Sequence, residues 1–114
     1  MADIEIRAQA FWTHREGTDC AAGFATSEDP EDGYVLFEGV AGGDPATLYV
    51  EVSDEIFGAE GAMESVTFND RGFVLLLKAA MAKKFGMVRE VAVFVDPADA
   101  DGQAALAVLR ELVG

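Results

Sequence analysis

Alternation of apolar and polar residues with a period of two is the feature that most restricts how this chain can fold. It runs through residues 3–12 and recurs in residues 34–40 and 48–53. Successive side chains of a strand point to opposite faces, so this period predicts strands with one buried face and one face in solvent. The chain is therefore expected to build its core mainly from half-buried strands.

A hairpin is predicted in the second half of the chain. Residues 65–68 and 73–77 flank Asn69–Gly72, a strong turn sequence. Because residues 74–77 are apolar on both faces, their strand is expected to be central and covered by a helix. The remaining strands are expected at residues 20–26, after a polar turn at 14–19, and at residues 88–95.

Helices are predicted only late in the chain. Residues 79–85 are good helix formers closed by Gly86. A second helix is expected to start with Asp96 as N-cap and Pro97 at its first position. Its apolar stripe would consist of Ala105, Val108, Leu109 and Leu112.

This order of elements predicts the α+β class. We expect a mainly antiparallel sheet of about six to seven strands, covered on one face by the short helix and the C-terminal helix. The length of 114 residues predicts a single domain, residues 1–114.

The negative charge is concentrated in the first part of the chain. Residues 1–64 contain 15 acidic and two basic residues, whereas residues 65–114 contain six of each. No Lys, Arg or His lies between Arg15 and Arg71. Such a one-sided field favours a basic partner and repels nucleic acid and anionic membranes. We therefore expect no binding to nucleic acid or to a membrane.

Nothing in the sequence predicts an enzyme, a metal or a cofactor. The single His14 and the single Cys20 are expected to flank one hairpin turn, and a buried cysteine with an exposed histidine is favoured over a catalytic pair. Nucleotide-binding loops and zinc motifs are absent. The N-terminus lacks a secretory pattern and no run of residues is long and apolar enough to cross a membrane, so the cytoplasm is the expected location.

Two acidic loops are the candidate binding sites. The first, residues 28–32, is interpreted as a solvated turn, a protein-binding loop or a cation site, although it lacks the spacing of a calcium loop. The second, residues 54–64, places Ile56 and Phe57 among acids, as a protein-binding surface with a polar rim would, unless both plug the core. The candidate partner-binding residues are Glu28, Asp29, Glu31, Asp32, Asp54, Glu55, Phe57 and Glu60.

Two further features suggest contacts with another chain. Phe11 and Trp12 are neighbours near the end of a predicted strand, so one of them is expected to be exposed or in an interface. Five of the eight Lys and Arg residues lie within residues 71–89, which fits a helix edge or a contact with the acidic half of a second copy.

Several segments spread over residues 20–113 together carry a family resemblance. They are Gly23–Ala25, the acidic turn, Tyr34–Phe37, Leu48–Val52, the loop before Glu64–Val66, the hairpin Asn69–Lys78, Met87–Asp96 and the closing helix. In this order they resemble the immunity protein 10 family of bacterial polymorphic toxin systems. The resemblance implies a small α+β protein that binds and neutralises a cognate toxin domain, often a nuclease.

The preferred hypothesis is therefore an immunity protein, not an enzyme, which inhibits a basic toxin domain through its acidic surface. Two alternatives remain open. One is a non-catalytic homodimer of unknown function, and the other is an enzyme that binds a small ligand or a metal through carboxylates, including paired carboxylates for glycoside chemistry.

Overall fold

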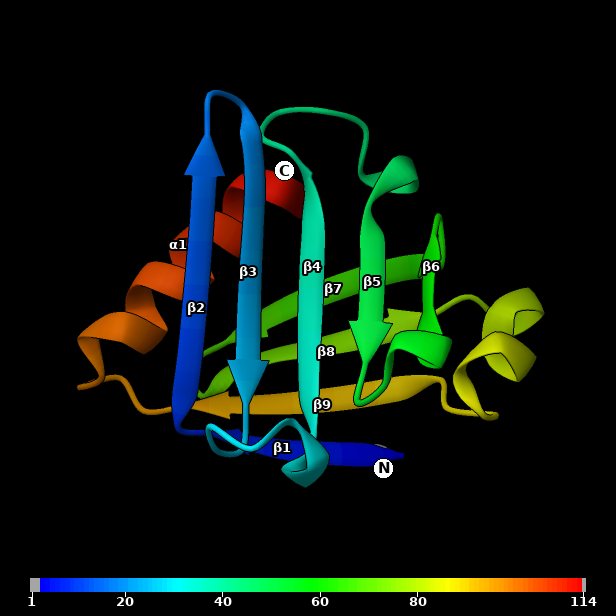
Figure 1. Ribbon diagram of the computed structural model, residues 1–114, viewed down its shortest axis with the longest axis horizontal. Coiled ribbons are helices and arrows are strands. Elements are labelled where there is room, and N and C mark those ends of the chain that lie inside the picture. The colour runs from blue at the N-terminus through cyan, green and yellow to red at the C-terminus, as the bar shows by residue number, and fades with distance from the viewer. Residues whose placement is uncertain (1–2, 114) are drawn as a thin grey trace.

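A computed structural model describes residues 3–113, so the predicted domain limits 1 and 114 lie just outside the described residues. Within them the chain forms strands, short 3-10 turns and one α-helix (Figure 1). The strands are β1 (Ile4–Ala8), β2 (Ala10–Glu16), β3 (Asp19–Ala25), β4 (Tyr34–Val40), β5 (Tyr49–Val52), β6 (Gly58–Glu60), β7 (Met63–Asn69), β8 (Gly72–Leu77) and β9 (Glu90–Val95). The helical elements are η1 (Pro30–Asp32), η2 (Pro45–Thr47), η3 (Glu55–Phe57), η4 (Ala79–Phe85) and α1 (Ala100–Val113).

The strands form two sheets that pack face to face. One sheet has the order β1-β9-β8-β7 and the other β2-β3-β4-β5-β6. Only β1 and β9 pair in parallel. Figure 1 shows the strands of one sheet running across those of the other, an orthogonal type of packing. The predicted α+β class and the mainly antiparallel pairing are confirmed, and the strands divide between two sheets where the sequence suggested one.

The predicted first strand is in fact two strands in different sheets. The chain leaves β1 at Ala8, and the backbone N–H of Gln9 bonds to the carbonyl of Ala25, which joins the two layers. The predicted polar turn at 14–19 was too long, because β2 continues to Glu16 and β3 resumes at Asp19. The period of two continues across the corner, so alternation alone could not reveal the change of sheet.

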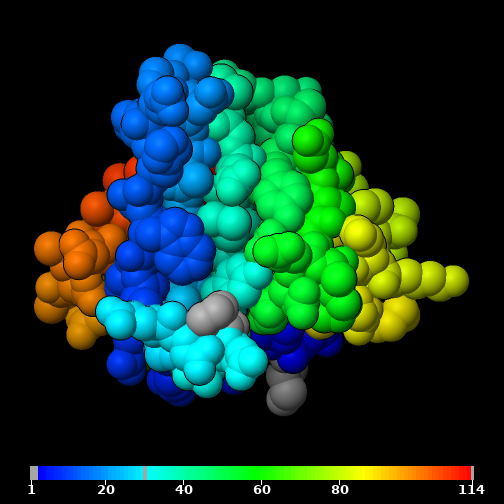
Figure 2. Space-filling model, viewed as in Figure 1, coloured from blue at the N-terminus to red at the C-terminus, as the bar shows by residue number. Residues whose placement is uncertain are grey.

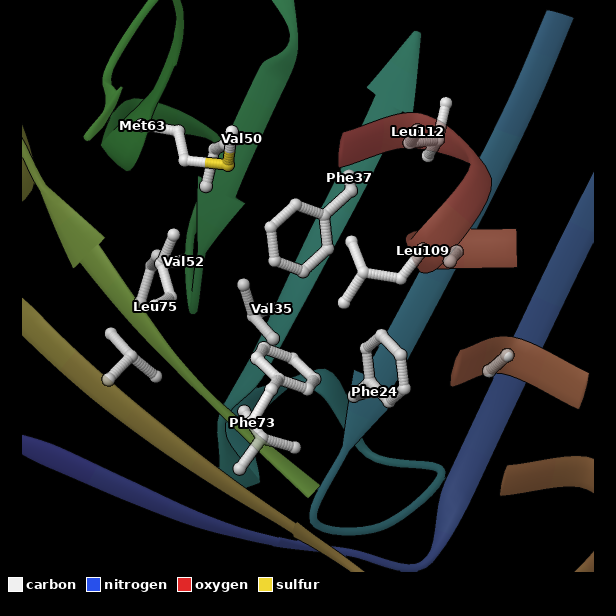
Figure 3. Close-up of a cluster of buried hydrophobic side chains, with 14 of the residues drawn as sticks. Phe24, Val35, Phe37, Val50, Val52, Met63, Phe73, Leu75, Leu109 and Leu112 are labelled. Carbon is white, nitrogen blue, oxygen red and sulfur yellow. The ribbon is translucent and has the colours of Figure 1, made fainter. Parts of the chain in front are cut away.

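The core lies between the sheets and is centred on three phenylalanine rings. The ring centroid of Phe73 on β8 lies 4.9 Å from that of Phe24 and 5.8 Å from that of Phe37. All three side chains are buried, and Figure 3 shows them near one another and beside Leu109 and Leu112 of α1. The prediction that β8 is central is confirmed. Its buried face packs against the other sheet, however, so the prediction that a helix covers β8 is wrong.

Helix α1 covers the part of the five-stranded sheet that the four-stranded sheet does not reach (Figure 1). It begins three residues after the predicted Pro97, because Asp99 supplies the N-cap by accepting a bond of 3.0 Å from the backbone N–H of Gly102. Asp96 instead caps a separate turn through the N–H of Ala98. The predicted apolar stripe is buried, as expected.

The other helical elements are short. Residues 79–85 are helical as predicted, but of the 3-10 type, and Gly86 ends them with φ of 66°, the expected left-handed conformation. The predicted loop at residues 54–64 contains the 3-10 turn η3 and also the edge strand β6, which was not predicted.

Candidate functional site

The outer face of the five-stranded sheet points away from the four-stranded sheet and from α1 (Figure 1). In Figure 2 the strands β2 to β5 lie side by side across this face. The strand register places Trp12, Gly23, Leu36 and Glu51 in one row across β2, β3, β4 and β5. Trp12 is 40% exposed, whereas its neighbour Phe11 turns inward and packs against the core, as the sequence predicted for such a pair.

Trp12 lies on the backbone of β3 because the residue beneath it is a glycine. A Cβ atom at Gly23 would collide with the indole ring, so any other residue would lift Trp12 off the sheet. The ring of Tyr34 stands beside the indole, with their centroids 6.3 Å apart. Trp12 is thus held in place by the sheet while part of its surface remains open to solvent.

Glu51 is the charged residue that the fold buries on this face. Its side chain is only 9% exposed. The hydroxyl of Tyr34 donates to Oε2, and the hydroxyl of Tyr49 donates to Oε1 at 2.6 Å. Tyr49 can reach because Gly58 lies beside its hydroxyl, where a Cβ atom would collide with it. A buried carboxylate is tolerated when donors satisfy its oxygens, and these two hydroxyls supply them.

The buried carboxylate keeps both tyrosines protonated. Burial, and then the hydrogen bond to Glu51, raises the pKa of Tyr34 well above its ordinary value. For Tyr49 the bond to Glu51 is the largest cause, and burial follows, raising the pKa to about 12. A tyrosinate beside this carboxylate would place two negative charges together. Both hydroxyls therefore act as fixed donors at neutral pH.

These pKa shifts predict an unusual alkaline titration. Tyr34 and Tyr49 are the only tyrosines in the sequence, so tyrosinate absorbance reports on this cluster alone. We expect the native protein to titrate near pH 12, and the urea-unfolded protein near the ordinary value of about 10. Because the native pKa values are raised, the stabilisation is complete below about pH 10 and is lost as the pH rises through about 12. If the tyrosines of the folded protein titrate near pH 10, the described hydrogen bonds between the two tyrosines and Glu51 are contradicted.

Two adjoining hollows lie on the face, and Trp12 and Leu36 line both of them. Their volumes are about 770 and 640 Å³. The first lies toward Tyr34 and the second toward Tyr49, and each is open to solvent. Besides Glu51, acidic residues line both: Glu28, Asp99 and Asp101 in the first, and Asp19, Glu38 and Glu60 in the second.

The basic side chains lie elsewhere in the described part of the chain. Arg15 pairs with Glu111 of α1. The guanidinium groups of Arg7 and Arg110 stack over Phe94 and Phe68, respectively. Five other Lys and Arg residues lie between β7 and β9, at positions 71, 78, 83, 84 and 89. Among residues 3–113, His14 is therefore the one basic side chain that the strand register places on this face.

The structure brings the two predicted acidic loops to the same end of the five-stranded sheet, where β4 begins and β5 ends (Figure 1). Only Glu28 of the first loop lines a hollow. Asp29 accepts from the N–H of Glu31 at 2.9 Å, and Asp32 accepts from the hydroxyl of Ser27 at 2.6 Å. Two of the four carboxylates thus shape their own loop, and all four acidic residues are exposed.

The second loop contributes less to this face. Asp54 caps η3 by accepting from the N–H of Ile56 at 3.1 Å, and Glu55 is exposed. Phe57 packs at the edge of the core, while Ile56 is 64% exposed. Glu60 lies on β6 opposite Tyr49 and lines the second hollow. The loop therefore supplies Glu60 to the face, while its apolar residues Phe57, Ala62 and Met63 pack in or against the core.

The centre of the face consists of Trp12, Tyr34, Tyr49 and Glu51. Sequence reasoning named Trp12 as one of two residues that could be exposed, and it missed Tyr34, Tyr49 and Glu51. A signal was present in part: Tyr49 and Glu51 are two residues apart in one strand, so they share a face. Their contact with Tyr34 depends on the pairing of β4 with β5. The need for glycine at positions 23 and 58 is visible only in the structure, where Trp12 and Tyr49 lie over them.

The structure separates the one histidine of the sequence from its one cysteine. His14 lies on the outer face, whereas Cys20 is buried in the core on the other side of the hairpin, so the two do not meet. Within residues 3–113, no group of three or more His, Cys, Asp or Glu side chains is arranged to hold a metal ion. No helix of the described chain is long and apolar enough to span a membrane.

Comparisons with family models, with curated proteins and with solved structures find no match for this chain.

Proposed function

We propose that this protein is a bacterial immunity protein, of the kind found in the immunity protein 10 family, which binds and neutralises a basic toxin domain. In this proposal it acts in the cytoplasm, by occlusion and without catalysis. The observation that carries the proposal is the uncovered face of the five-stranded sheet, where an exposed indole lies among acidic side chains and the Lys and Arg residues lie elsewhere.

The composition of this face supports binding to a protein. Trp and Tyr dominate the energetic centres of protein interfaces, because they bury a large area at a small cost in conformational entropy. Here Trp12 is seated on Gly23, and both tyrosines are fixed by Glu51, so little ordering is needed on association. The acidic rim would supply polar contacts around this centre.

Charge supports a basic partner. Nuclease toxins hold phosphates with basic surfaces. An acidic inhibitor would associate rapidly through electrostatic steering and would cover the phosphate-binding site. By the same reasoning, a net charge of −13 disfavours binding to DNA, RNA or anionic membranes.

The proposal implies that a basic toxin domain is encoded beside this gene, and calorimetry with that domain at low and high salt would test it. We expect tight binding that weakens as salt is added. Absence of binding by the folded protein at both salt concentrations would overturn the proposed function.

A pair of matched charge reversals locates the interface. Glu38 lies on the proposed face, whereas Glu5 lies on β1 in the other sheet, and both are exposed strand residues. We expect Glu38→Lys to slow association with the toxin domain about five- to tenfold, and Glu5→Lys to slow it less than about twofold. Stopped-flow measurements at low salt would check this. Equal effects would mean that net charge matters and the face does not.

The acidic loop needs its own variant. Glu28→Lys combined with Glu31→Lys leaves Asp29 and Asp32, whose carboxylates hold the loop, unchanged. Slower association is expected if the loop lies at the interface. An unchanged rate would remove residues 28–32 from the binding surface while leaving the sheet face in place.

A further inference from the structure

We propose that the hollow beside Trp12 and Tyr34 is the receptor site for one arginine side chain of the partner protein. This inference rests on the proposed function and specifies the chemistry at its centre. The guanidinium group would stack on the exposed part of the Trp12 indole and face the carboxylates of the rim.

The hollow is assembled from four separate parts of the chain. Its sides include Trp12 from β2, and Tyr34 and Glu51 from β4 and β5. Small residues, Ala10 and Ala25, lie at the end near Tyr34 and leave the space unfilled. The rim is completed by Glu28, from the loop between β3 and β4, and by Asp99 and Asp101 at the start of α1.

The charges around the hollow favour a cation. None of its lining side chains is basic. Asp99 is engaged as the cap of α1, and Glu51 is engaged by the two tyrosine hydroxyls. Within residues 3–113, the carboxylates of Glu28 and Asp101 form no side-chain hydrogen bond or ion pair, so both remain available to a ligand. Asp99 and Asp101 also offset the positive end of the helix dipole, which would otherwise repel a cation.

The aromatic wall favours guanidinium over ammonium. A guanidinium group is planar, weakly hydrated and able to stack on a ring while its N–H groups reach carboxylates. Trp12 presents such a ring, fixed on Gly23. The same stacking occurs twice within this molecule, where the guanidinium carbon of Arg110 lies 4.1 Å from the centroid of Phe68 and that of Arg7 lies 5.3 Å from that of Phe94.

The single tryptophan of the sequence makes the hollow directly observable. The probe is the blocked tripeptide Gly-Arg-Gly, titrated into the protein while Trp12 fluorescence is followed. Gly-citrulline-Gly serves as the uncharged peptide of the same shape, and Gly-Lys-Gly as the ammonium analogue. We expect a saturable change with the arginine peptide, about two- to fivefold weaker binding of the lysine peptide, and no saturation with citrulline.

Matched variants separate this hollow from general acidity. Glu28→Gln with Asp101→Asn removes the two available carboxylates, whereas Glu38→Gln with Glu60→Gln removes the same charge from the second hollow. We expect the first pair to weaken arginine-peptide binding at least about fivefold and the second less than about twofold. Circular dichroism would confirm that both variants are folded. Equal weakening, or saturation by the citrulline peptide, would overturn the inference.

Binding of the toxin domain distinguishes this inference from the proposed function. If the toxin domain binds, and the Glu28→Gln, Asp101→Asn variant binds it as tightly as the native protein, the function stands and the arginine site is overturned. If the arginine peptide binds in the expected pattern but the toxin domain does not bind, the chemistry of the hollow stands and the proposed function is overturned. A loss of toxin affinity in this variant that clearly exceeds the loss in the Glu38→Gln, Glu60→Gln variant supports both.

Discussion

Phe73→Ala is expected to lower the free energy of unfolding by about 3–5 kcal/mol. The Phe73 ring joins the two layers of the fold, with centroids 4.9 Å from Phe24 on the opposite sheet and 6.2 Å from Phe68 on the same sheet. Removing it leaves a cavity between two hydrogen-bonded sheets. Because strand pairing restrains both sheets, the neighbouring side chains can fill the cavity only in part. Urea denaturation followed by fluorescence and by circular dichroism would measure the loss.

Phe94→Ala provides a matched control for this prediction. Phe94 is the same residue type on the adjacent strand β9, but it lies on the other face of the sheet, half-buried beneath Arg7. We expect this substitution to cost much less than Phe73→Ala. If the two variants lose similar stability, the centre of the core does not lie between the sheets as described.

The double variant Tyr34→Phe, Tyr49→Phe is expected to lose about 2–4 kcal/mol at neutral pH. Both rings keep their shape, but the buried Glu51 carboxylate loses both hydroxyl donors. An unsatisfied buried charge costs far more than a lost hydrogen bond between neutral groups. Urea denaturation of the two single variants and of the double variant would separate the contributions, and Tyr34→Phe should cost more because Tyr34 is more deeply buried.

Adding Glu51→Leu to that double variant is expected to restore most of the lost stability. The substitution removes the charge that needs hydrogen-bond donors and puts an apolar side chain of similar size in its place. Restoration would show that the loss came from the carboxylate and not from repacking of the rings. A further loss of stability in the triple variant would contradict the role assigned to the two hydroxyls.

Local elements were predictable because their signals are local. Strand β4 was predicted with its observed limits, and the hairpin turn before Gly72 and the left-handed Gly86 were identified from residue type. The division into two sheets could not be predicted, because Ile4, Ile6 and Ala8 alternate with polar residues in the same way as the residues that follow Gln9. Alternation specifies which side chains share a face, but not which sheet that face belongs to.

The same limit applies to the candidate site. Glu28 and Glu60 were predicted from acidity and lie at the two hollows of the sheet face. Trp12 was predicted only as a residue that is exposed if Phe11 is not. Its neighbours across the sheet, Gly23 and Leu36, are separated from it by two strand pairings that no short sequence pattern encodes.

The sequence by itself determined the strand-rich α+β class, most of the turns, the buried stripe of α1 and the concentration of acid in the first 64 residues. These follow from side-chain period, turn chemistry and charge, each of which acts over a few residues. Only the tertiary structure decided which sheet face stays uncovered and how Trp12, Tyr34, Tyr49 and Glu51 meet on it. That meeting depends on hydrogen-bonded pairing between β2, β3, β4 and β5 and on the packing of the second sheet and α1 against their other side.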